Sequence, residues 1–220
     1  MTNSENVKTT SRRDAIQQLA VATAGLSLFS LAACGDNKKQ EDPKKTTKVL
    51  TPFYLPPAET LQPGPGGSAI RTWIRSSQTN MQYSSVEAAV APKKMGPSPH
   101  SHKDLDEVML VLEGTASVLV EDTLYEIPAG GWHMRPRGIV HTFFNNTDKP
   151  LRFMDMYFNQ NFEDYLEELY FKIIPDMVQN KLSPADPSIA KRFAALDLKF
   201  GVTMYPEKRQ VIIDKYGLIG

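Results

Sequence analysis

Two short stretches rich in histidine and glycine constrain this chain of 220 residues more than any other feature. The first places His100 and His102 two residues apart, with Glu107 and then Gly114 further along. Successive side chains of a strand alternate between its two faces, so His100 and His102 are expected to point to the same side. We expect Glu107 to lie on the adjoining strand segment, with its carboxylate directed toward the two imidazoles.

The second stretch supplies a third histidine. Its fixed residues are Gly130, Pro136, Gly138, His141 and Asn145. A turn at 136–138 would bring the histidine in on a later strand. The two stretches can therefore direct three imidazoles and one carboxylate toward a common point.

The predicted metal ligands are His100, His102, Glu107 and His141. Neutral imidazoles and an ionised carboxylate suit first-row divalent ions such as iron, manganese, nickel or zinc. Four protein ligands on an octahedral ion leave two adjacent positions open to water, dioxygen or a chelating substrate. A surface or core role for the histidines is the alternative, but three of the four in the chain fall on fixed positions of these two stretches.

Both stretches resemble the two conserved motifs of the cupin superfamily. The second matches at every fixed position, and the first departs only at its opening, where Lys94 replaces the usual glycine and Gly96 lies two residues later. The resemblance covers residues 61–158. It implies an all-β jelly-roll barrel with a metal at its centre, and it identifies no substrate.

Short apolar runs separated by turn residues agree with many closely spaced strands. The predicted strands are 71–75, 81–90, 107–112, 115–120, 124–127, 132–135, 141–145 and 151–158. Run 107–112 is apolar on both faces and should be covered on both sides. The cover would be the C-terminal helix or a second subunit, which would make the protein a homodimer.

The region after residue 158 has helical periodicity. Apolar residues recur at helical spacing over 162–174, with Asn161 as the predicted cap of a capping-box-like start and Pro175 as the end or a kink. A second helix is predicted over 186–201. We expect the apolar stripe of the first helix to pack against the barrel.

Residues 1–33 have the pattern of an export signal. Arg12 and Arg13 precede an uncharged run, 19–33, that is shorter than the ~20 residues needed to span a bilayer. The paired arginines resemble a twin-arginine signal, with an ordinary secretory signal as the alternative. The four residues ending in Cys34, the only cysteine, resemble a bacterial lipobox, so Cys34 is the predicted lipid attachment point.

The predicted organisation has four parts: a signal peptide (1–33), a lipid-anchored tether and lead-in (34–60), the barrel (61–158) and a helical extension (159–220). A lipid on the first residue of the mature chain would tether the protein to a membrane of the bacterial cell envelope. The chain has 25 basic and 25 acidic residues, which gives no reason to expect nucleic-acid binding. Folded export would load the metal in the cytoplasm, so we expect iron or manganese, with nickel and zinc as alternatives.

Two further residues, His133 and Arg135, share one face of a predicted strand. On the inner face they would add an acid/base group and a cation near the metal, and the arginine would favour a carboxylate-bearing ligand. Exposure to solvent is the alternative. Trp132, Tyr83 and Phe143 are candidates for lining the pocket or for packing.

The sequence therefore predicts an exported metallocupin that acts on a small organic molecule as an oxygenase, isomerase or decarboxylase. The first alternative is a metal-dependent cupin that only binds a small ligand. The second is a structural role, in which the metal stabilises the fold.

Overall fold

Ten strands form two five-stranded antiparallel sheets in the computed structural model, which describes residues 49–220. The first sheet has the order β1 (Ser68–Ile74), β2 (Tyr83–Val90), β9 (Leu151–Phe158), β4 (Asp106–Glu113) and β7 (Trp132–Arg135). The second has the order β10 (Val202–Met204), β3 (His100–His102), β8 (His141–Phe144), β5 (Thr115–Val120) and β6 (Thr123–Pro128). The predicted mostly β fold is confirmed. The predicted signal peptide and Cys34 lie outside the described residues.

The barrel interior is built from inward-facing residues, which alternate most regularly along β4 and β9. In β4 the buried Met109 and Val111 face inward, while Val108 and Leu110 between them are only half-buried. Inward residues of the two sheets form one apolar cluster: Val90, Met109, Val111, Ala116, Val118, Ile127, Leu151 and Phe153. This cluster fills one part of the barrel interior. The predicted metal ligands are not among its residues and lie in another part of the interior.

The turn between β4 and β5 requires a glycine. Gly114 has a φ of +78°, a conformation that residues with a Cβ rarely adopt. A Cβ here would also lie 2.5 Å from the carbonyl oxygen of Pro150. Gly114, which the first motif fixes in sequence, therefore serves the backbone and takes no part in ligand binding.

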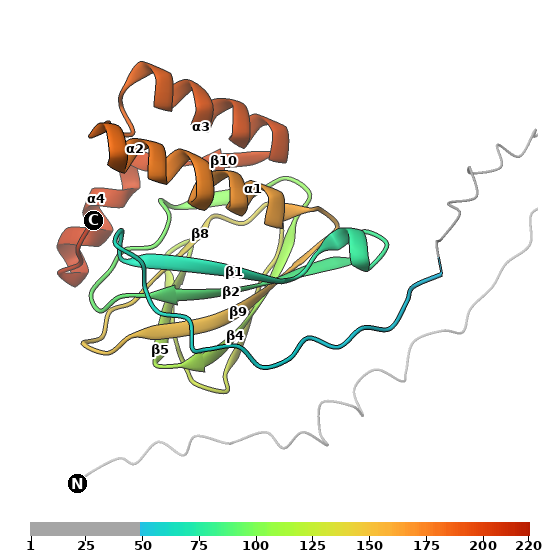
Figure 1. The fold of residues 1–220 in the computed structure, drawn as a ribbon. Helices are drawn as coiled ribbons and strands as arrows, with labels where there is room; N and C mark the ends of the chain where they lie inside the picture. Colours follow the sequence, from blue (N-terminus) through green and yellow to red (C-terminus); the bar gives the residue numbers. More distant parts are fainter. Residues whose placement is uncertain (1–48) are drawn as a thin grey trace, which may run out of the picture. The chain divides into compact units, whose positions relative to one another are not determined.

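The chain after β9 is mostly helical and gathers at one end of the barrel (Figure 1). Its elements are α1 (Phe162–Glu168), the π-helical turn η3 (Leu169–Ile173), α2 (Ile174–Asn180), α3 (Pro187–Phe200), the 3₁₀ turn η4 (Pro206–Lys208) and α4 (Arg209–Tyr216). A further 3₁₀ turn, η2 (Ser76–Gln78), follows β1. Within the described residues, no helix has both the length and the apolar character needed to cross a membrane.

The predicted helices are confirmed with three differences. Asn161 does not cap α1 through its side chain, because its Nδ2 donates to the Asp164 carboxylate at 2.6 Å. Pro175 does not end the helix. It lies in the first turn of α2, and the chain enters α2 through the π-helical turn η3, where the helical hydrogen-bond pattern changes. The second predicted helix does end at Gly201, which has a φ of +62°, but the chain then forms β10, a strand that the sequence did not predict.

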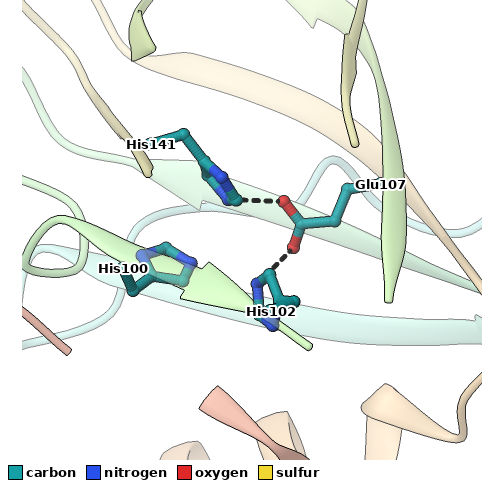
Figure 2. Close-up of side chains that lie close together, drawn as sticks. All are labelled: His100, His102, Glu107 and His141. Atoms are coloured by element: carbon teal, nitrogen blue, oxygen red, sulfur yellow. Dashed lines mark ion pairs between the residues drawn. The ribbon is translucent and has the colours of Figure 1, made fainter. Parts of the chain in front are cut away.

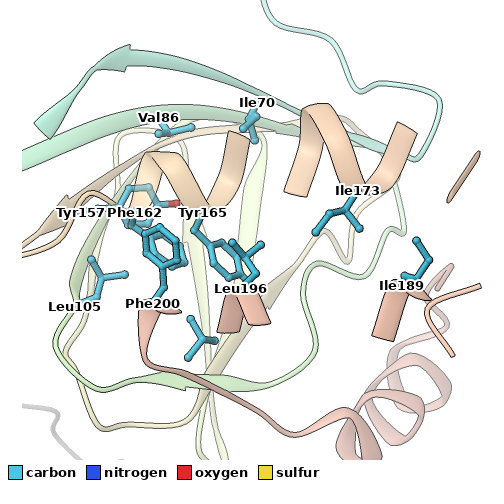
Figure 3. Packing of buried hydrophobic residues seen from close by; sticks show 11 residues of the cluster. Ile70, Val86, Leu105, Tyr157, Phe162, Tyr165, Ile173, Ile189, Leu196 and Phe200 are labelled. Atoms are coloured by element: carbon cyan, nitrogen blue, oxygen red, sulfur yellow. The ribbon is translucent and has the colours of Figure 1, made fainter. Parts of the chain in front are cut away.

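The predicted apolar stripe packs against the barrel end. Phe162, Tyr165 and Ile173 are buried, and they join one cluster with Ile70 and Val86 of the first sheet (Figure 3). The helices therefore cover the end of the barrel, and the cluster takes no residue from β4.

Candidate metal centre

Strands from both sheets bring the four predicted ligands together (Figure 2). His100 on β3 pairs directly with His141 on β8, and Glu107 reaches them from β4 of the other sheet. One donor atom from each of the four residues lies within 4.8 Å of the others. All four side chains are buried, with residue exposures between 1% and 8%. Residues that the sequence separates by up to 41 positions thus form one cluster suited to a single ion.

Backbone carbonyls fix the tautomers of two of the imidazoles. His100 Nδ1 lies 2.9 Å from the carbonyl oxygen of Ser98, and His141 Nδ1 lies 3.0 Å from that of Ile139. A carbonyl oxygen can only accept, so each Nδ1 carries the proton and donates it. The Nε2 atom of each ring is left with its lone pair free, as in a metal ligand oriented by a neighbouring group.

The centre contains buried nitrogen atoms that the protein itself does not satisfy. Both ring nitrogens of His102 and the Nε2 of His141 are buried without a hydrogen-bond partner. Glu107 lies close to both, with Oε1 3.3 Å from His102 Nε2 and Oε2 2.9 Å from His141 Nε2, but neither contact has hydrogen-bond geometry. Unsatisfied buried polar atoms are costly, and a cation between the carboxylate and the rings would satisfy the Nε2 of His141 and one nitrogen of His102. The residues present therefore fit a bound metal.

Protonation states agree with this donor set. Burial, assisted by the neighbouring His141 and His102 rings, lowers the pKa of His100 to about 3, so its ring is neutral near pH 7. Burial alone would raise the pKa of Glu107, but Arg135 and the His141 ring outweigh that effect and hold it well below its ordinary value. A neutral imidazole and an ionised carboxylate are the forms that bind a divalent ion.

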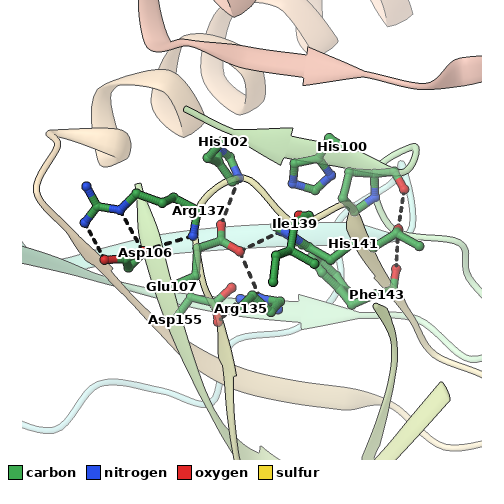
Figure 4. A network of polar contacts seen from close by, with 12 residues as sticks. His100, His102, Asp106, Glu107, Arg135, Arg137, Ile139, His141, Phe143 and Asp155 are labelled. Carbon is green, nitrogen blue, oxygen red and sulfur yellow. Dashed lines mark hydrogen bonds and ion pairs between the residues drawn. The ribbon is translucent and has the colours of Figure 1, made fainter. Parts of the chain in front are cut away.

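Arg135 lies inside the barrel beneath Glu107 (Figure 4). It is 1% exposed, with Nε 2.9 Å from Glu107 Oε2 and Nη2 2.6 Å from Asp155 Oδ1. The Tyr157 hydroxyl donates to the other oxygen of Asp155 at 3.3 Å. Arg135 thus forms an ion pair with the carboxylate of the predicted metal ligand Glu107. Its Nη1 is buried without a hydrogen-bond partner.

The charges inside the barrel balance only if one of two acids is protonated or a further cation is bound. Glu107 and Asp155 are two acids beside the one guanidinium of Arg135. Burial raises the pKa of Asp155 to about 7, against the opposing effect of Arg135, which shows how poorly this interior holds a second negative charge. Asp155 was missed in the sequence, although a lone acid among apolar residues at an inward position of 151–158 was a usable signal.

His133 shares the inner face of β7 with Arg135 but lies two residues along the strand from it, opposite a core residue and not opposite a predicted ligand. Its register partner is Met109, whereas that of Arg135 is Glu107. The half-buried ring of His133 lies 4.8 Å from that of Tyr125, between centroids, and it is not among the four clustered donors.

Of the three aromatic candidates, Phe143 contacts the arginine that pairs with Glu107, with its ring centroid 6.0 Å from the guanidinium carbon of Arg135. Trp132 is 60% exposed on the outer face of the sheet. Phe143 packs edge-on against Phe153 in the barrel core, with centroids 5.0 Å apart. Tyr83 lies beside Phe158 at 6.2 Å. Phe143 thus has a packing role, and Trp132 does not line the metal centre.

The helical extension holds the ligand strand in place. β10 pairs with β3 through Val202–His102 and Met204–His100, so each β3 histidine has a backbone neighbour from the extension. Lys103 N–H also donates to the Gly201 carbonyl at 2.9 Å. Above the centre, the Phe162 ring lies against that of His102. The extension is therefore part of the site's framework.

Comparison with known proteins agrees with this fold. Residues 86–157, which include all four clustered donors, match the cupin domain family Cupin_2. The chain has a mostly β cupin fold with two antiparallel sheets and a short helical region after them. No curated protein matches the sequence.

Several solved structures are similar to this chain. KdgF from Halomonas sp. is 15% identical, with a TM-score of 0.40, over 44% of this chain and 84% of that one. The polyketide cyclase RemF from Streptomyces resistomycificus is 24% identical, with a TM-score of 0.39, over 46% of this chain and 71% of that one. A sugar phosphate isomerase from a cupin superfamily of Silicibacter pomeroyi is 21% identical, with a TM-score of 0.37, over 43% and 60% of the two chains.

Proposed function

We propose that this cupin-domain protein binds one divalent metal ion through His100, His102, Glu107 and His141 and uses it to act on a small organic molecule. The observation that carries the proposal is the set of buried, unpartnered ring nitrogens around one carboxylate. When bound, the ion would supply a Lewis acid with open positions for a substrate or dioxygen. Oxygenase and isomerase chemistry are the classes we favour, with iron or manganese as the ion and nickel or zinc as alternatives.

The protein's own residues would prepare the site for such a ligand. Arg135 orients Glu107 and neutralises part of its charge, and a cation at this position favours an anionic group on the bound molecule. His133 is the acid/base group we assign at the edge of this network. Burial and the nearby charge of Arg135 lower its pKa, so its ring is neutral near pH 7 and able to accept a proton.

One observation favours a second function, in which the metal only stabilises the fold. The four donors are nearly inaccessible, and the Phe162 ring covers His102 at 4.9 Å between centroids. A closed, fully protein-satisfied ion is typical of structural sites, and catalytic sites keep an open position.

Metal analysis of the protein isolated through its native export route tests the metal proposal. We expect about one ion per chain. Cobalt(II)-loaded protein titrated with azide then separates the two functions. A change in the visible spectrum at an open position supports the catalytic proposal, and an unchanged spectrum supports the structural one.

We also propose that the chain is exported and tethered to the cell envelope by a lipid on Cys34. The basis is the sequence of residues 1–34 alone. Changing Arg12 and Arg13 to Lys should abolish export if the twin-arginine route is used. Continued export of that variant would favour the ordinary secretory route.

A further inference from the structure

The metal centre is nearly closed to solvent, because its four donors are at most 8% exposed. A small molecule can therefore reach it only if a neighbouring group moves. The donors lie on β3, β4 and β8, and each of these strands pairs with another strand on both of its sides. Phe162, in contrast, lies against His102 from the first residue of α1, outside the two sheets. It is therefore the neighbour that can move while the strands stay paired.

Four aromatic rings surround the ring of Phe162. Its centroid lies 4.9 Å from that of His102, 5.0 Å from Tyr157, 4.7 Å from Tyr165 and 6.2 Å from Phe200 (Figure 3). Tyr165 is stacked on it, with ring planes at 9°, while His102 and Phe200 meet it edge-on at 85° and 82°. Aromatic rings prefer stacked and edge-on contacts of this kind. The place that Phe162 occupies, which we call the ring site, is therefore shaped for a flat aromatic ring beside the metal centre.

The segment that carries Phe162 is poorly satisfied in its closed position. Asn159 has a φ of +70°, which is uncommon for a residue with a Cβ, and Asn161 begins α1 without a side-chain cap. The Oε1 of Gln160 and the Oε2 of Glu163 are buried, and neither has a hydrogen-bond partner among residues 49–220. Water would hydrogen-bond to both oxygens once they were exposed, so the loss of packing around Phe162 would be partly offset.

Contacts with the turn η2 hold this segment against the barrel. Glu163 Oε1 accepts from the Ser76 N–H at 2.8 Å and from the Ser76 hydroxyl at 2.6 Å. Arg75, which precedes Ser76, has its Nη1 3.7 Å from Asp164 Oδ1, and both of these side chains are nearly half exposed. Breaking these contacts would release the first turn of α1 and leave every strand pair intact.

We propose that Phe162 is the gate of the metal centre and that its ring occupies the place of an aromatic ring of the substrate. The inference rests on the proposed function, because it names the class of molecule that reaches the metal. When the first turn of α1 moves outward, the ring that enters stacks on Tyr165 and meets the edge of Phe200. His102 borders the ring site, so the substrate carries its polar or anionic group next to its aromatic ring. An aliphatic chain would lose the stacked and edge-on contacts.

Three hydroxamates test the ring site, because they share one metal-binding group and differ in the group attached to it. They are titrated into cobalt(II)-loaded full chain with Cys34→Ser, and the visible spectrum reports binding. Benzohydroxamate should bind about tenfold more tightly than cyclohexanecarbohydroxamate, whose ring is not flat, and acetohydroxamate gives the value without a ring. A cyclohexane analogue that binds as tightly as benzohydroxamate would overturn the inference. A chain that takes up no cobalt would overturn the proposed function, and the inference with it.

Variants of Phe162 separate a gate from a packing residue. Phe162→Ala vacates the ring site, so benzohydroxamate should bind about tenfold more tightly than to the wild type, and acetohydroxamate should gain less. Phe162→Leu keeps an apolar side chain, folds more readily, and should shift the constants in the same direction. Phe171→Ala, at an exposed position of η3, is the control and should leave both constants unchanged. Equal changes for the two hydroxamates in both Phe162 variants would overturn the inference.

A cross-link tests the movement itself. R75C/D164C, made with Cys34→Ser, is loaded with cobalt(II) and joined by a short bis-maleimide, which fixes the first turn of α1 to the barrel. Benzohydroxamate should bind at least about tenfold more slowly than to the same protein capped with N-ethylmaleimide. Equal binding rates in the joined and the capped protein would overturn the gate. Circular dichroism checks the folding of each variant.

Discussion

The ring of Phe162 lies edge-on to the imidazole of His102, with centroids 4.9 Å apart and ring planes at 85°. Phe162 is also stacked on Tyr165, with centroids 4.7 Å apart, and is 4% exposed. The first residue of α1 is thus part of the wall of the metal centre. The helical extension and the centre are joined by this contact as well as by the β10–β3 pairing.

Replacing Phe162 with Ala should destabilise the protein and loosen the centre. Removing a buried aromatic ring costs about 3–5 kcal/mol. The cavity also opens one side of His102, so bound metal should transfer to a chelator faster than in the wild type. Urea unfolding and a chelator competition assay measure the two effects. Phe171→Ala is the control, because Phe171 is 58% exposed in η3. Equal release rates in both variants would contradict a covering role for Phe162.

Replacing His102 with Ala should remove the metal and leave the barrel folded. Its ring nitrogens have no hydrogen-bond partner in the protein, so removing the ring leaves no other group without its partner. We expect the metal content to fall from about one ion per chain to below about one tenth. Elemental analysis measures this, and circular dichroism checks the fold. His133→Ala should retain the metal, since His133 is not among the clustered donors. Retention of full stoichiometry in His102→Ala would show that this residue is not a ligand.

Replacing Arg135 with Met should destabilise the barrel strongly. The change leaves Glu107 and Asp155 buried without their cation, and breaking a buried ion pair costs about 3–5 kcal/mol. The double variant R135M/D155N should recover part of this loss, because it also removes one of the stranded charges. Denaturant unfolding of the single and double variants measures the loss of unfolding free energy and its recovery. Arg137→Met, at the exposed pair with Asp106, should change little. No recovery in the double variant would refute the charge argument.

Most of the barrel could be predicted because its strands show local signals. Alternation in 107–112 and 151–158 matches β4 and β9 closely, and the motif spacing brought His100, His102, Glu107 and His141 into one cluster. These residues depend on strand periodicity, which a sequence displays directly.

The elements missed in the sequence depend on contacts between distant residues. β10 has three residues and exists by pairing with β3, about 100 positions earlier. Asp155 was missed because its partner Arg135 could be assigned to the inside or the outside of β7 from the sequence alone. Likewise, no local sequence pattern predicts the π-helical turn η3 before Pro175.

Replacing Cys34 with Ser should release the protein from the membrane or block its maturation. The predicted lipid would be attached to this thiol, and no helix of residues 49–220 is long and apolar enough to cross a membrane. Fractionation of cells followed by immunoblotting measures the distribution. Gly35→Ala, next to the cysteine, is the control and should remain membrane-bound. Normal processing and membrane retention of Cys34→Ser would contradict the lipobox interpretation.

The stability of the metal-free protein should depend on pH through Asp155. Its pKa is raised by burial from 3.8 to about 7, with Arg135 opposing the rise. Below pH 3.8 the carboxyl is protonated in the folded and the unfolded chain. As the pH rises, the unfolded chain loses this proton first, while the folded chain keeps it up to about pH 7. The folded state then binds more protons, so the contribution of Asp155 to the free energy of unfolding falls across this window.

Asp155→Asn isolates this contribution from those of other titrating groups. The free energy of unfolding of the wild type, minus that of the variant, should decrease between pH 4 and 7 and level off above it, when both are measured in urea with a chelator present. A divalent ion at the centre adds positive charge near Asp155 and favours its ionised form, so metal loading should flatten the same difference. A pH-independent difference in the metal-free protein would mean that Asp155 is already ionised at pH 4 through its pair with Arg135.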